Sequence, residues 1–561
     1  MAMKKEDTLS KEKLHAEIER LKKELEKRKK YGLVWEEKPE EVVEMCKQKL
    51  PVLKEVRNRG IMIGPNKQVN LLIEGDNYHA LSVLNYTHKN RIDVIYIDPP
   101  YNTGAKDWKY NNAYVDENDA YRHSKWLSFM DKRLRLAKNL LKHTGVLICT
   151  IDENEHASLG LLLQEIFFDR EIVCVTIIHN PGGIQGNNFS YCHEYAYFVY
   201  PAGGRYINLQ ERDENPDVRP LRNVSKGDHL RDTAANCFYP IFVKNGEIVG
   251  FGEVCHDSFH PKSANIVRED GTIEIYPIDT QGNERKWVFA RQSVETIIGE
   301  LKVEFNKKRG IWDIIRKKTK FPYKTVWTDP KYNANLFGTQ LLSKIIMTKF
   351  PFPKSLYAVE DCIQAVIHNK DTAVILDFFA GSGTTGHAVL ELNKRDSGNR
   401  QFVLCTNNEN NICTDVCYPR IQKVIEGYTD LKGRKIGGLG GNLKYFRTDF
   451  VDAEPTDKNK KKLTEQATEM LCIKESTYEK ILERKDFKIF KNSNHYTGII
   501  FDQLAIPEFK KAIKEIKNKF SVYVFSLGDD IFDEEFEDVK QKVRLSPIPE
   551  AILRVYRRIF K

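Results

Sequence analysis

The residues with the clearest capacity for chemistry are Asp98, Pro99, Pro100 and Tyr101, which follow the largely apolar run 91–97. That run predicts a buried parallel strand, and the prolines hold the residues after it in a fixed, extended path. The Asp98 carboxylate, a backbone carbonyl and the Tyr101 ring should then lie at the carboxyl edge of a sheet, where open α/β folds bind ligands. Two acceptors beside a stacking ring suit a planar ring that carries an exocyclic amine. The alternative is an ordinary strand followed by a proline-rich turn.

A second stretch, residues 377–385, reads Asp-Phe-Phe-Ala-Gly-Ser-Gly-Thr-Thr and joins a predicted strand to a predicted helix. With the strand that follows, it predicts a βαβ unit. Gly381 and Gly383 let the backbone approach a ligand closely, and the amides at the start of the helix suit a carboxylate. Asp377 can accept a hydrogen bond from an ammonium group. Such a loop alone is weak evidence, and its spacing is not that of the dinucleotide-binding Gly-x-Gly-x-x-Gly motif.

The Asp98 to Tyr101 tetrapeptide resembles motif IV of the amino-methyltransferases that modify adenine N6 or cytosine N4 in DNA. With the later glycine-rich motif, it resembles a β-class enzyme, in which the catalytic half precedes the recognition region and the cofactor loop. The resemblance covers about residues 70–449. Asn102-Thr103-Gly104 and the long C-terminal extension look most like the modification (Mod) subunit of a Type III restriction–modification system. Aspartate at the first position is usual for adenine N6, whereas serine is more typical of cytosine N4 enzymes.

This resemblance implies S-adenosylmethionine as cofactor and a target adenine flipped out of duplex DNA. Asp98 and the Pro99 carbonyl would accept hydrogen bonds from the target amine, and Tyr101 would stack on the base. No metal is required. The residues predicted to bind the cofactor are Asp377, Phe379, Gly381, Gly383, Thr384, Asp76, Lys354 and Glu409.

Three of these cofactor residues have structural alternatives. Asp76 either faces the cofactor adenine or caps the helix that follows it. Lys354 either pairs with the methionyl carboxylate or is a solvated surface lysine. The acidic ribose ligand is expected near the strand that ends at Cys405, where the chain reads Thr-Asn-Asn-Glu, so either Glu409 or an asparagine takes that role.

The order of the motifs predicts a Rossmann-like α/β methyltransferase sheet with an inserted target-recognition domain. An N-terminal helix and a small α+β C-terminal domain complete the architecture. The predicted parts are an N-terminal helical segment (1–45), the catalytic half (46–201), the target-recognition domain (202–335), the cofactor-binding half (336–450) and the C-terminal domain (451–561).

Several segments have less specific interpretations. Leucine and isoleucine spacing over residues 9–30 predicts a helix that docks on its own chain or on a second subunit, or one that is merely solvated. Residues 105–121 are predicted to form a loop rich in basic and aromatic residues, which either contacts DNA or is a mobile surface loop. Residues 285–289 read as a strand and 457–462 as a charged linker. Phe189 and Tyr191 either flank a flipped base or act as lid or packing residues. His193 and Glu194 resemble an acid–base pair but read as the start of a strand.

The amino-acid composition narrows the possible class, compartment and partners of the protein. The 561-residue chain is 41% hydrophobic and 30% charged, without a run that could span a bilayer or a signal-peptide core. Its 11 cysteines lack Cys-x-x-Cys pairs, which favours a reduced, cytoplasmic protein. The net charge of +9 is compatible with double-stranded DNA as partner. We also expect a homodimer and a possible restriction (nuclease or helicase) subunit. The rivals are a DNA-binding assembly subunit without catalysis, and an RNA methyltransferase.

Overall fold

The computed structural model describes residues 38–64, 67–183, 188–212, 216–225, 227–348, 350–367, 370–528 and 530–560. The predicted helix over residues 9–30 lies outside these ranges, so its docking stays a prediction. The chain divides into two compact units. Residues 207–323 form one, and the other contains the rest of the described chain.

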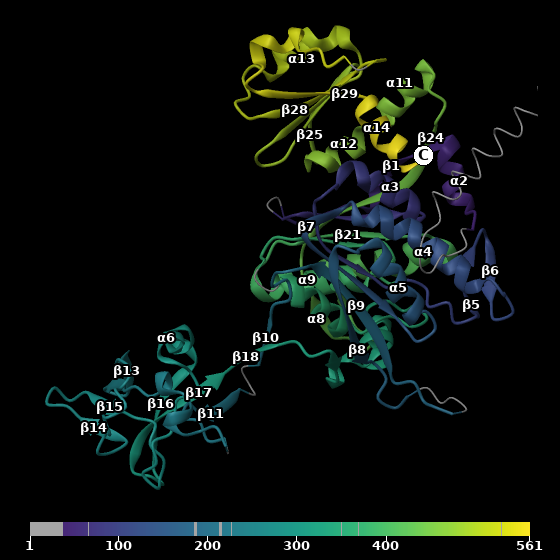
Figure 1. Ribbon diagram of the computed structural model, residues 1–561. Coiled ribbons are helices and arrows are strands. Elements are labelled where there is room, and N and C mark those ends of the chain that lie inside the picture. The colour runs from purple at the N-terminus through teal and green to yellow at the C-terminus, as the bar shows by residue number, and fades with distance from the viewer. Residues whose placement is uncertain are drawn as a thin grey trace, which may run out of the picture. The chain divides into compact units, whose positions relative to one another are not determined.

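The larger unit is built on an 11-stranded sheet (Figure 1). Its centre is five parallel strands in the order β3 (Val69–Glu74), β21 (Gln401–Thr406), β20 (Val374–Asp377), β4 (Ile92–Ile97) and β7 (Leu141–Ile151). All six residues of β4 are buried, as its apolar pattern predicted. Strands β4 and β20 are neighbours, so the two motifs that follow them meet at one sheet edge. The predicted Rossmann-like α/β class is confirmed.

Both sides of the sheet extend beyond this parallel centre. Beside β3 lie β24 (Asn442–Asp452), parallel to it, and then antiparallel β1 (Lys49–Glu55), while β2 (Ile61–Met62) pairs with β24. Beside β7 lies antiparallel β9 (His193–Pro201), followed by β8 (Arg170–Ile178) and β19 (Val326–Trp327). Because β9 runs against β7, it begins where β7 ends, with Tyr195 opposite Ile151.

Helices cover both faces of this sheet. One face carries α3 (Asn77–Thr87), α4 (Arg122–Lys138) and α5 (His156–Ile166), and the other carries α8 (Leu356–Ile367), α9 (Thr384–Asp396) and α10 (Tyr418–Glu426). The predicted apolar face of α4 is buried, including Trp126, Met130 and Leu134. Shorter elements of this unit are α2 (Glu41–Gln48), α7 (Gln340–Ile345), β5 (Ala105–Tyr110), β6 (Ala113–Asp116), β22 (Gly427–Thr429) and β23 (Lys435–Gly437).

The C-terminal part adds a second sheet with strand order β25 (Glu479–Glu483), β26 (Phe487–Lys491), β27 (Tyr496–Ile500), β28 (Phe520–Phe525) and β29 (Val543–Ile548). Its helices are α11 (Asp457–Gln466), α12 (Thr468–Glu475), α13 (Ile506–Ile513) and α14 (Glu550–Ile559). The linker predicted over residues 457–462 is wrong, because Thr456 caps α11 there by accepting from the Asn459 amide at 3.2 Å. Helices α12 and α14 share one hydrophobic core with α3.

The smaller unit contains short antiparallel sheets around a core with Tyr239, Trp287 and Ile314. Its elements are β10 (Leu209–Glu211), β11 (Asp217–Pro220), β12 (Ile241–Lys244), β13 (Glu247–Phe251), β14 (Asn265–Val267), β15 (Ile273–Ile275), α6 (Arg291–Val294), β16 (Leu301–Asn306), β17 (Ile311–Lys318) and β18 (Lys320–Pro322). The strand predicted over residues 285–289 is wrong. Only isolated bridges form there, from Trp287 to Arg222 and from Arg285 to Leu230.

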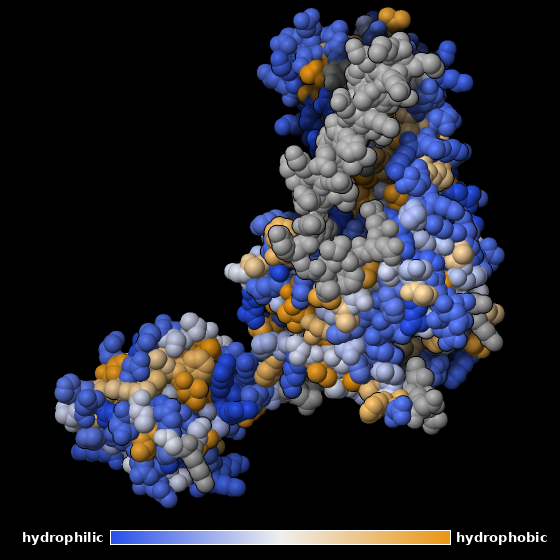
Figure 2. Space-filling model, turned by 45° about the vertical axis from the view of Figure 1, so that its right-hand side comes forward, coloured by the Kyte–Doolittle hydropathy of each residue, from blue (hydrophilic) through white to orange (hydrophobic). Residues whose placement is uncertain are grey.

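On the face of the molecule in Figure 2, apolar residues lie in separate patches among hydrophilic ones. Phe189 and Tyr191 are among the exposed aromatics, with Phe189 80% accessible, so they are not packing residues; a role beside a flipped base stays a prediction. No helix in the described ranges is long and apolar enough to cross a membrane.

Candidate active site

The predicted catalytic tetrapeptide lies at the carboxyl end of β4, beside the end of β7. Asp98 accepts a hydrogen bond from the Thr150 hydroxyl at 2.7 Å. The Trp126 indole donates to the Pro100 carbonyl at 2.7 Å and fixes the path of the two prolines. The Asp98 side chain remains 26% exposed. The Asp98 carboxylate is thus accessible at the end of a buried strand, and Pro99 and Pro100 lead from it to the Tyr101 ring.

Two further charged side chains complete this site. Glu194, at the start of β9, accepts from the Tyr101 hydroxyl at 3.1 Å. Lys354 donates to both Glu194 and the Tyr101 hydroxyl, and its Nζ lies 3.3 Å from an Asp98 oxygen. The same ammonium sits 4.5 Å from the centroid of the Tyr101 ring. We refer to Asp98, Tyr101, Glu194 and Lys354 as the base-site cluster.

For Lys354 the structure contradicts one of the two alternatives. At 12% exposed it is not a solvated surface lysine, whereas its pairing with the methionyl carboxylate stays a prediction. Helix α8 begins two residues later, at Leu356, and the Pro353–Lys354 segment that precedes it reaches the end of β4. Glu194 was read only as part of a strand. That strand exists, but its first residues lie at the carboxyl edge of β7 because β9 is antiparallel.

Burial and mutual charge set the protonation of this cluster. Burial raises the pKa of Asp98, and the Lys354 ammonium offsets only part of that rise. Burial also acts to raise the pKa of Glu194, but Lys354 and His179 outweigh it and lower that pKa. For Lys354 itself, the carboxylates of Asp98 and Glu194 outweigh burial and raise the pKa. The arrangement is one ammonium held between two carboxylates.

The glycine-rich motif forms the turn between β20 and α9. Asp377 is buried and accepts from the Phe379 amide at 2.9 Å and from the Thr385 hydroxyl at 2.5 Å. Burial raises the pKa of Asp377 to about 7. Gly381 and Gly383 have φ of +47° and +78°, in the left-handed region that favours glycine. The turn therefore needs both glycines for its backbone path.

An arginine that the sequence analysis did not single out supports this turn from α10. The fully buried Arg420 donates to the Thr384 hydroxyl at 2.8 Å and to the Ser382 hydroxyl at 3.1 Å. Its second terminal nitrogen lies 3.3 Å from His387 Nδ1. Burial lowers the pKa of Arg420 to about 10. The Thr384 hydroxyl thus accepts a hydrogen bond from Arg420, and any role of Thr384 toward a cofactor stays a prediction.

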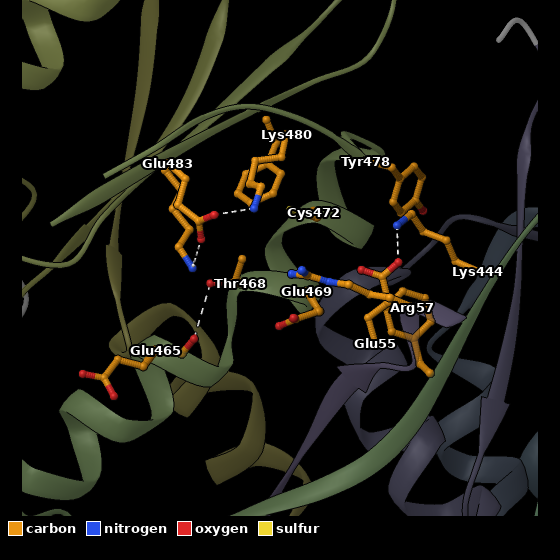
Figure 3. A pocket seen from close by; sticks show the side chains of 13 residues that line it. Glu55, Arg57, Lys444, Glu465, Thr468, Glu469, Cys472, Tyr478, Lys480 and Glu483 are labelled. Atoms are coloured by element: carbon orange, nitrogen blue, oxygen red, sulfur yellow. Dashed lines mark hydrogen bonds and ion pairs between the residues drawn. The ribbon is translucent and has the colours of Figure 1, made fainter. Parts of the chain in front are cut away.

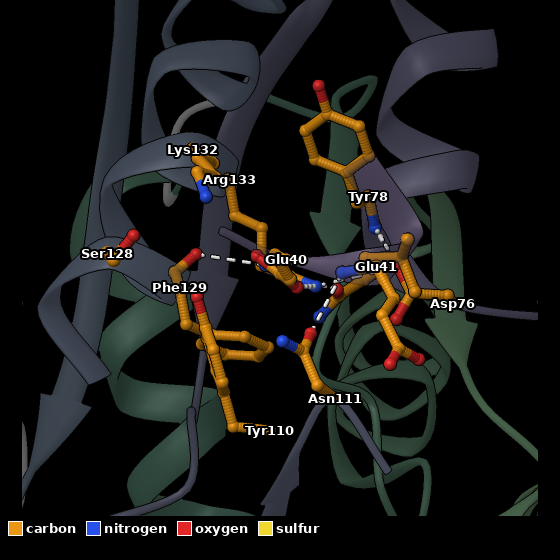
Figure 4. A network of polar contacts seen from close by, with 12 residues as sticks. Glu40, Glu41, Asp76, Tyr78, Tyr110, Asn111, Ser128, Phe129, Lys132 and Arg133 are labelled. Atoms are coloured by element: carbon orange, nitrogen blue, oxygen red, sulfur yellow. Dashed lines mark hydrogen bonds and ion pairs between the residues drawn. The ribbon is translucent and has the colours of Figure 1, made fainter. Parts of the chain in front are cut away.

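Asp76 is the N-cap of α3, the structural alternative given above, and accepts from the Tyr78 amide at 2.7 Å. It belongs to a buried network around Arg133, drawn in Figure 4. Arg133 pairs with Glu40 at 2.6 Å, lies 3.6 Å from Asp76 and donates to Asn77. Asn77 in turn donates to the Phe378 carbonyl at 3.1 Å. The network therefore connects the cap of α3 to the glycine-rich turn.

Phe379 and Glu409 lie at this end of the sheet too. The Phe379 ring is 5.8 Å from that of Phe129 on α4. Glu409 follows β21 and forms an ion pair with Lys109 of the β5–β6 hairpin. The loop predicted over residues 105–121 is corrected in part: Trp108 and Tyr110 are buried in this hairpin and cannot stack on DNA in this arrangement.

A cavity of about 90 Å³ lies elsewhere, at the seam between α12, β25 and β26 on one side and β1 and β24 on the other (Figure 3). Its charged side chains largely neutralise one another, as in the ion pairs of Lys444 with Glu55 and of Lys488 with Glu483. None of the predicted site residues lines it. Within the described ranges, no group of three His, Cys, Asp or Glu side chains could hold a metal ion.

A central parallel sheet with Asp-Pro-Pro-Tyr after β4 and the glycine-rich turn after β20 is the architecture of a Rossmann-like methyltransferase. The family model described as DNA methylase matches residues 92–416, and the chain belongs to this family. The matched residues run from the start of β4 past β21, the strand that follows the glycine-rich turn.

Curated relatives include both Type III and Type II proteins. The chain is 29% identical over 385 residues to the Type III restriction–modification enzyme EcoPI Mod subunit of Escherichia phage P1, covering 61% of this chain and 58% of that one. It is 29% identical to the Type II methyltransferase M.KpnI of Klebsiella pneumoniae, covering 64% and 89%. The chain thus spans little more than half of the EcoPI Mod subunit.

Solved structures give more distant matches. The M1.HpyAVI–SAM complex aligns with 63% of this chain and 98% of its own, at 12% identity and a TM-score of 0.29. The cytosine-N4-specific PvuII DNA methyltransferase aligns with 64% and 90%, at 9% identity and a TM-score of 0.28.

Proposed function

We propose that this chain transfers a methyl group from S-adenosylmethionine to N6 of adenine in duplex DNA. The observation that carries the proposal is the placement of Asp98 and Asp377 at the ends of two adjacent parallel strands. One carboxylate belongs to a site with a stacking ring, and the other to a glycine turn at the start of a helix. A base and a methyl donor bound at these two places would meet at one sheet edge.

The base-site cluster supports the proposed chemistry. With the adenine flipped out of the duplex, Tyr101 stacks on its ring, and Asp98 and the Pro99 carbonyl accept hydrogen bonds from its amine. These contacts fix the orientation of the amine so that its nitrogen faces the methyl donor. Flipping costs a few kcal/mol, and holding the two reactants in line supplies most of the rate.

The glycine-rich turn fits the amino-acid end of the cofactor. Asp377 is a buried carboxylate whose pKa is raised by burial, and an ammonium group beside it would offset the cost of its charge. The positive φ angles of Gly381 and Gly383 keep side chains away from the turn. Asp76, Phe379, Thr384 and Glu409 would line the rest of the cofactor site. S-adenosylmethionine supplies the reactive methyl group on a sulfonium, which is a good leaving group.

The same proposal extends to the other parts of the chain. The segment 202–335, which includes the compact unit 207–323, would read the DNA sequence. The segment contains a basic run over residues 316–320, in which Arg316 pairs with Glu300 and Lys320 with Glu211. The proposed recognition role therefore rests on the position of the segment between the two halves of the sheet, not on that run. The segments 1–45 and 451–561 would serve a homodimer or a restriction subunit in the cytoplasm, in line with the Type III Mod relatives.

The decisive test is methyl transfer from labelled S-adenosylmethionine to mixed-sequence duplex DNA, read by nucleoside mass spectrometry. We expect label on adenine N6, and a loss of at least about 100-fold in Asp98→Ala with cofactor binding kept. Asp169→Ala, which removes an exposed ion-paired carboxylate, is the matched control and should stay active.

Other outcomes would revise the proposal in defined ways. Label on cytosine N4 would change the base but keep the site. Label only on RNA would overturn the DNA substrate, because a protein that reads major-groove base edges discriminates against A-form RNA. Duplex binding without transfer would favour a non-catalytic assembly subunit.

A further inference from the structure

The buried ion pair between Lys354 and Glu194 joins segments 160 residues apart in the sequence. The Glu194 side chain is 5% exposed and that of Lys354 12%. Removing two such charges from water costs several kcal/mol per ion, and apolar side chains often do as well for stability. A pair in this position therefore points to a role in the site that surrounds it.

The geometry around the ammonium indicates that role. Lys354 lies 3.3 Å from the Asp98 oxygen that also accepts from Thr150, and it covers the ring of Tyr101. Under the proposed function, the target amine needs an acceptor on Asp98 and the base needs a face of Tyr101. In the DNA-free protein, Lys354 lies against one oxygen of Asp98 and over one face of the Tyr101 ring. Glu194 offers it a second carboxylate beside the first.

We propose that Lys354 and Glu194 are a positioning pair for the target base. Lys354 holds the place of the target amine on Asp98 until the base arrives, and Glu194 then keeps the displaced ammonium in the site. This inference rests on the proposed function and adds two residues to it. A simple structural pair would require only the contact between Lys354 and Glu194, not the contacts with Asp98 and with the Tyr101 ring.

The pair also balances charge. With Lys354 removed, Asp98 and Glu194 are two carboxylates in one buried site, and one of them tends to keep a proton. With Glu194 neutralised, Asp98 is the carboxylate of the cluster that still contacts Lys354, so Lys354 should bind Asp98 more firmly and compete with the target amine. Other groups whose charge or dipole faces the cluster are His179, Asp152, Cys149, Cys362, Tyr96, Thr150 and Asp377.

The test is the single-turnover rate of methyl transfer against pH, with enzyme and S-adenosylmethionine saturating. The rate should fall at acid pH as Asp98 takes up a proton. Lys354→Met should move this acid limb upward by about one pH unit or more, because the cation that lowers the Asp98 pKa is lost. Glu194→Gln should move it downward and raise the DNA concentration needed for half-saturation. The double variant should fall between the two single variants.

Two controls separate positioning from folding. Lys354→Arg keeps the charge and should leave the limb at the wild-type pH, although the rate falls. Lys142→Met breaks a comparable ion pair, with Asp93 at 2.7 Å near the start of β4, at the other end of that strand from the cluster, and should leave the profile unchanged. Binding of S-adenosylmethionine checks that each variant is folded.

The outcomes are distinct. If the acid limbs of the pH–rate profiles coincide for all folded variants of an active enzyme, the positioning role of the pair is overturned and the proposed function stands. A wild-type chain that binds S-adenosylmethionine but methylates no duplex would overturn the proposed function, and the role of the pair with it. Opposite shifts in the two single variants, with the double variant between them, would support the pair.

Discussion

Asp98 and Asp377 lie at the carboxyl ends of adjacent strands but in different electrostatic settings. Asp98 follows β4, Asp377 is the last residue of β20, and both accept a hydrogen bond from a threonine hydroxyl, from Thr150 and Thr385 respectively. Asp98 also has the Lys354 ammonium at 3.3 Å. Within the part of the chain that the structure describes, no lysine or arginine forms an ion pair with Asp377. One carboxylate has its cation built in, and the other lacks one.

The difference teaches what each site requires of a ligand. A ligand at Asp98 has to displace a cation, so its hydrogen-bonding groups must match those of an ammonium, as an exocyclic amine does in part. A ligand at Asp377 instead relieves an uncompensated buried carboxylate, which an amino-acid ammonium does well. The two sites are thus selective for different nitrogen groups through the same kind of side chain.

Asp377→Asn gives the largest effect expected from this comparison. Asparagine keeps the side-chain shape, and its single oxygen can accept from the Phe379 amide while its NH2 group donates to the Thr385 hydroxyl, but it cannot balance an ammonium. We expect the affinity for S-adenosylmethionine to fall about 100-fold, in the range for a charged hydrogen bond. Isothermal titration calorimetry measures this directly. Unchanged affinity would show that Asp377 does not bind the cofactor ammonium, and would contradict the proposed difference between the two carboxylates.

The pH dependence of cofactor binding sharpens the same contrast. Because the pKa of Asp377 is raised to about 7 in the ligand-free protein, the carboxyl is protonated below that pH and must lose its proton to pair with an ammonium. Affinity should therefore fall as pH decreases from 7 to 5.5, by up to about tenfold per unit. Calorimetry in two buffers of different ionisation enthalpy should show proton release, which Asp377→Asn abolishes. A flat affinity profile in the wild type would contradict this.

The sequence was sufficient for the features that local pattern and chain order determine. Asp98 and Asp377 each end an apolar run, and parallel strands bring their carboxyl ends to one edge, so both could be placed before the structure was known. Glu194 could not. A charged residue at the start of a strand reaches that edge only if the strand is antiparallel, and nothing local distinguishes β9 from a parallel strand.

The contacts of Lys354 and of the hairpin were not predictable for related reasons. The path of the Pro353–Lys354 segment depends on tertiary contacts, so nothing in the local sequence places Lys354 beside Asp98. Trp108 and Tyr110 were predicted to be available for stacking because their neighbours are polar, yet long-range contacts bury them. The Trp108 ring lies 5.3 Å from that of Phe129, and Tyr110 donates to the Pro39 carbonyl at 3.0 Å.

The smallest expected effect, and the most symmetrical test, comes from removing one hydroxyl at each carboxylate. Thr385→Val and Thr150→Val keep the side-chain shape and delete the donors to Asp377 and Asp98. Because a hydrogen bond to a charged group contributes about 1.5–3 kcal/mol when fully formed, and water or a ligand replaces part of it, we expect changes of about fivefold to tenfold.

Thr385→Val should weaken S-adenosylmethionine binding and leave the transfer rate at saturating cofactor near normal. Thr150→Val should do the reverse. If both variants changed the same parameter, the two carboxylates would belong to one binding site, and the assignment of the base to Asp98 and of the cofactor to Asp377 would be wrong.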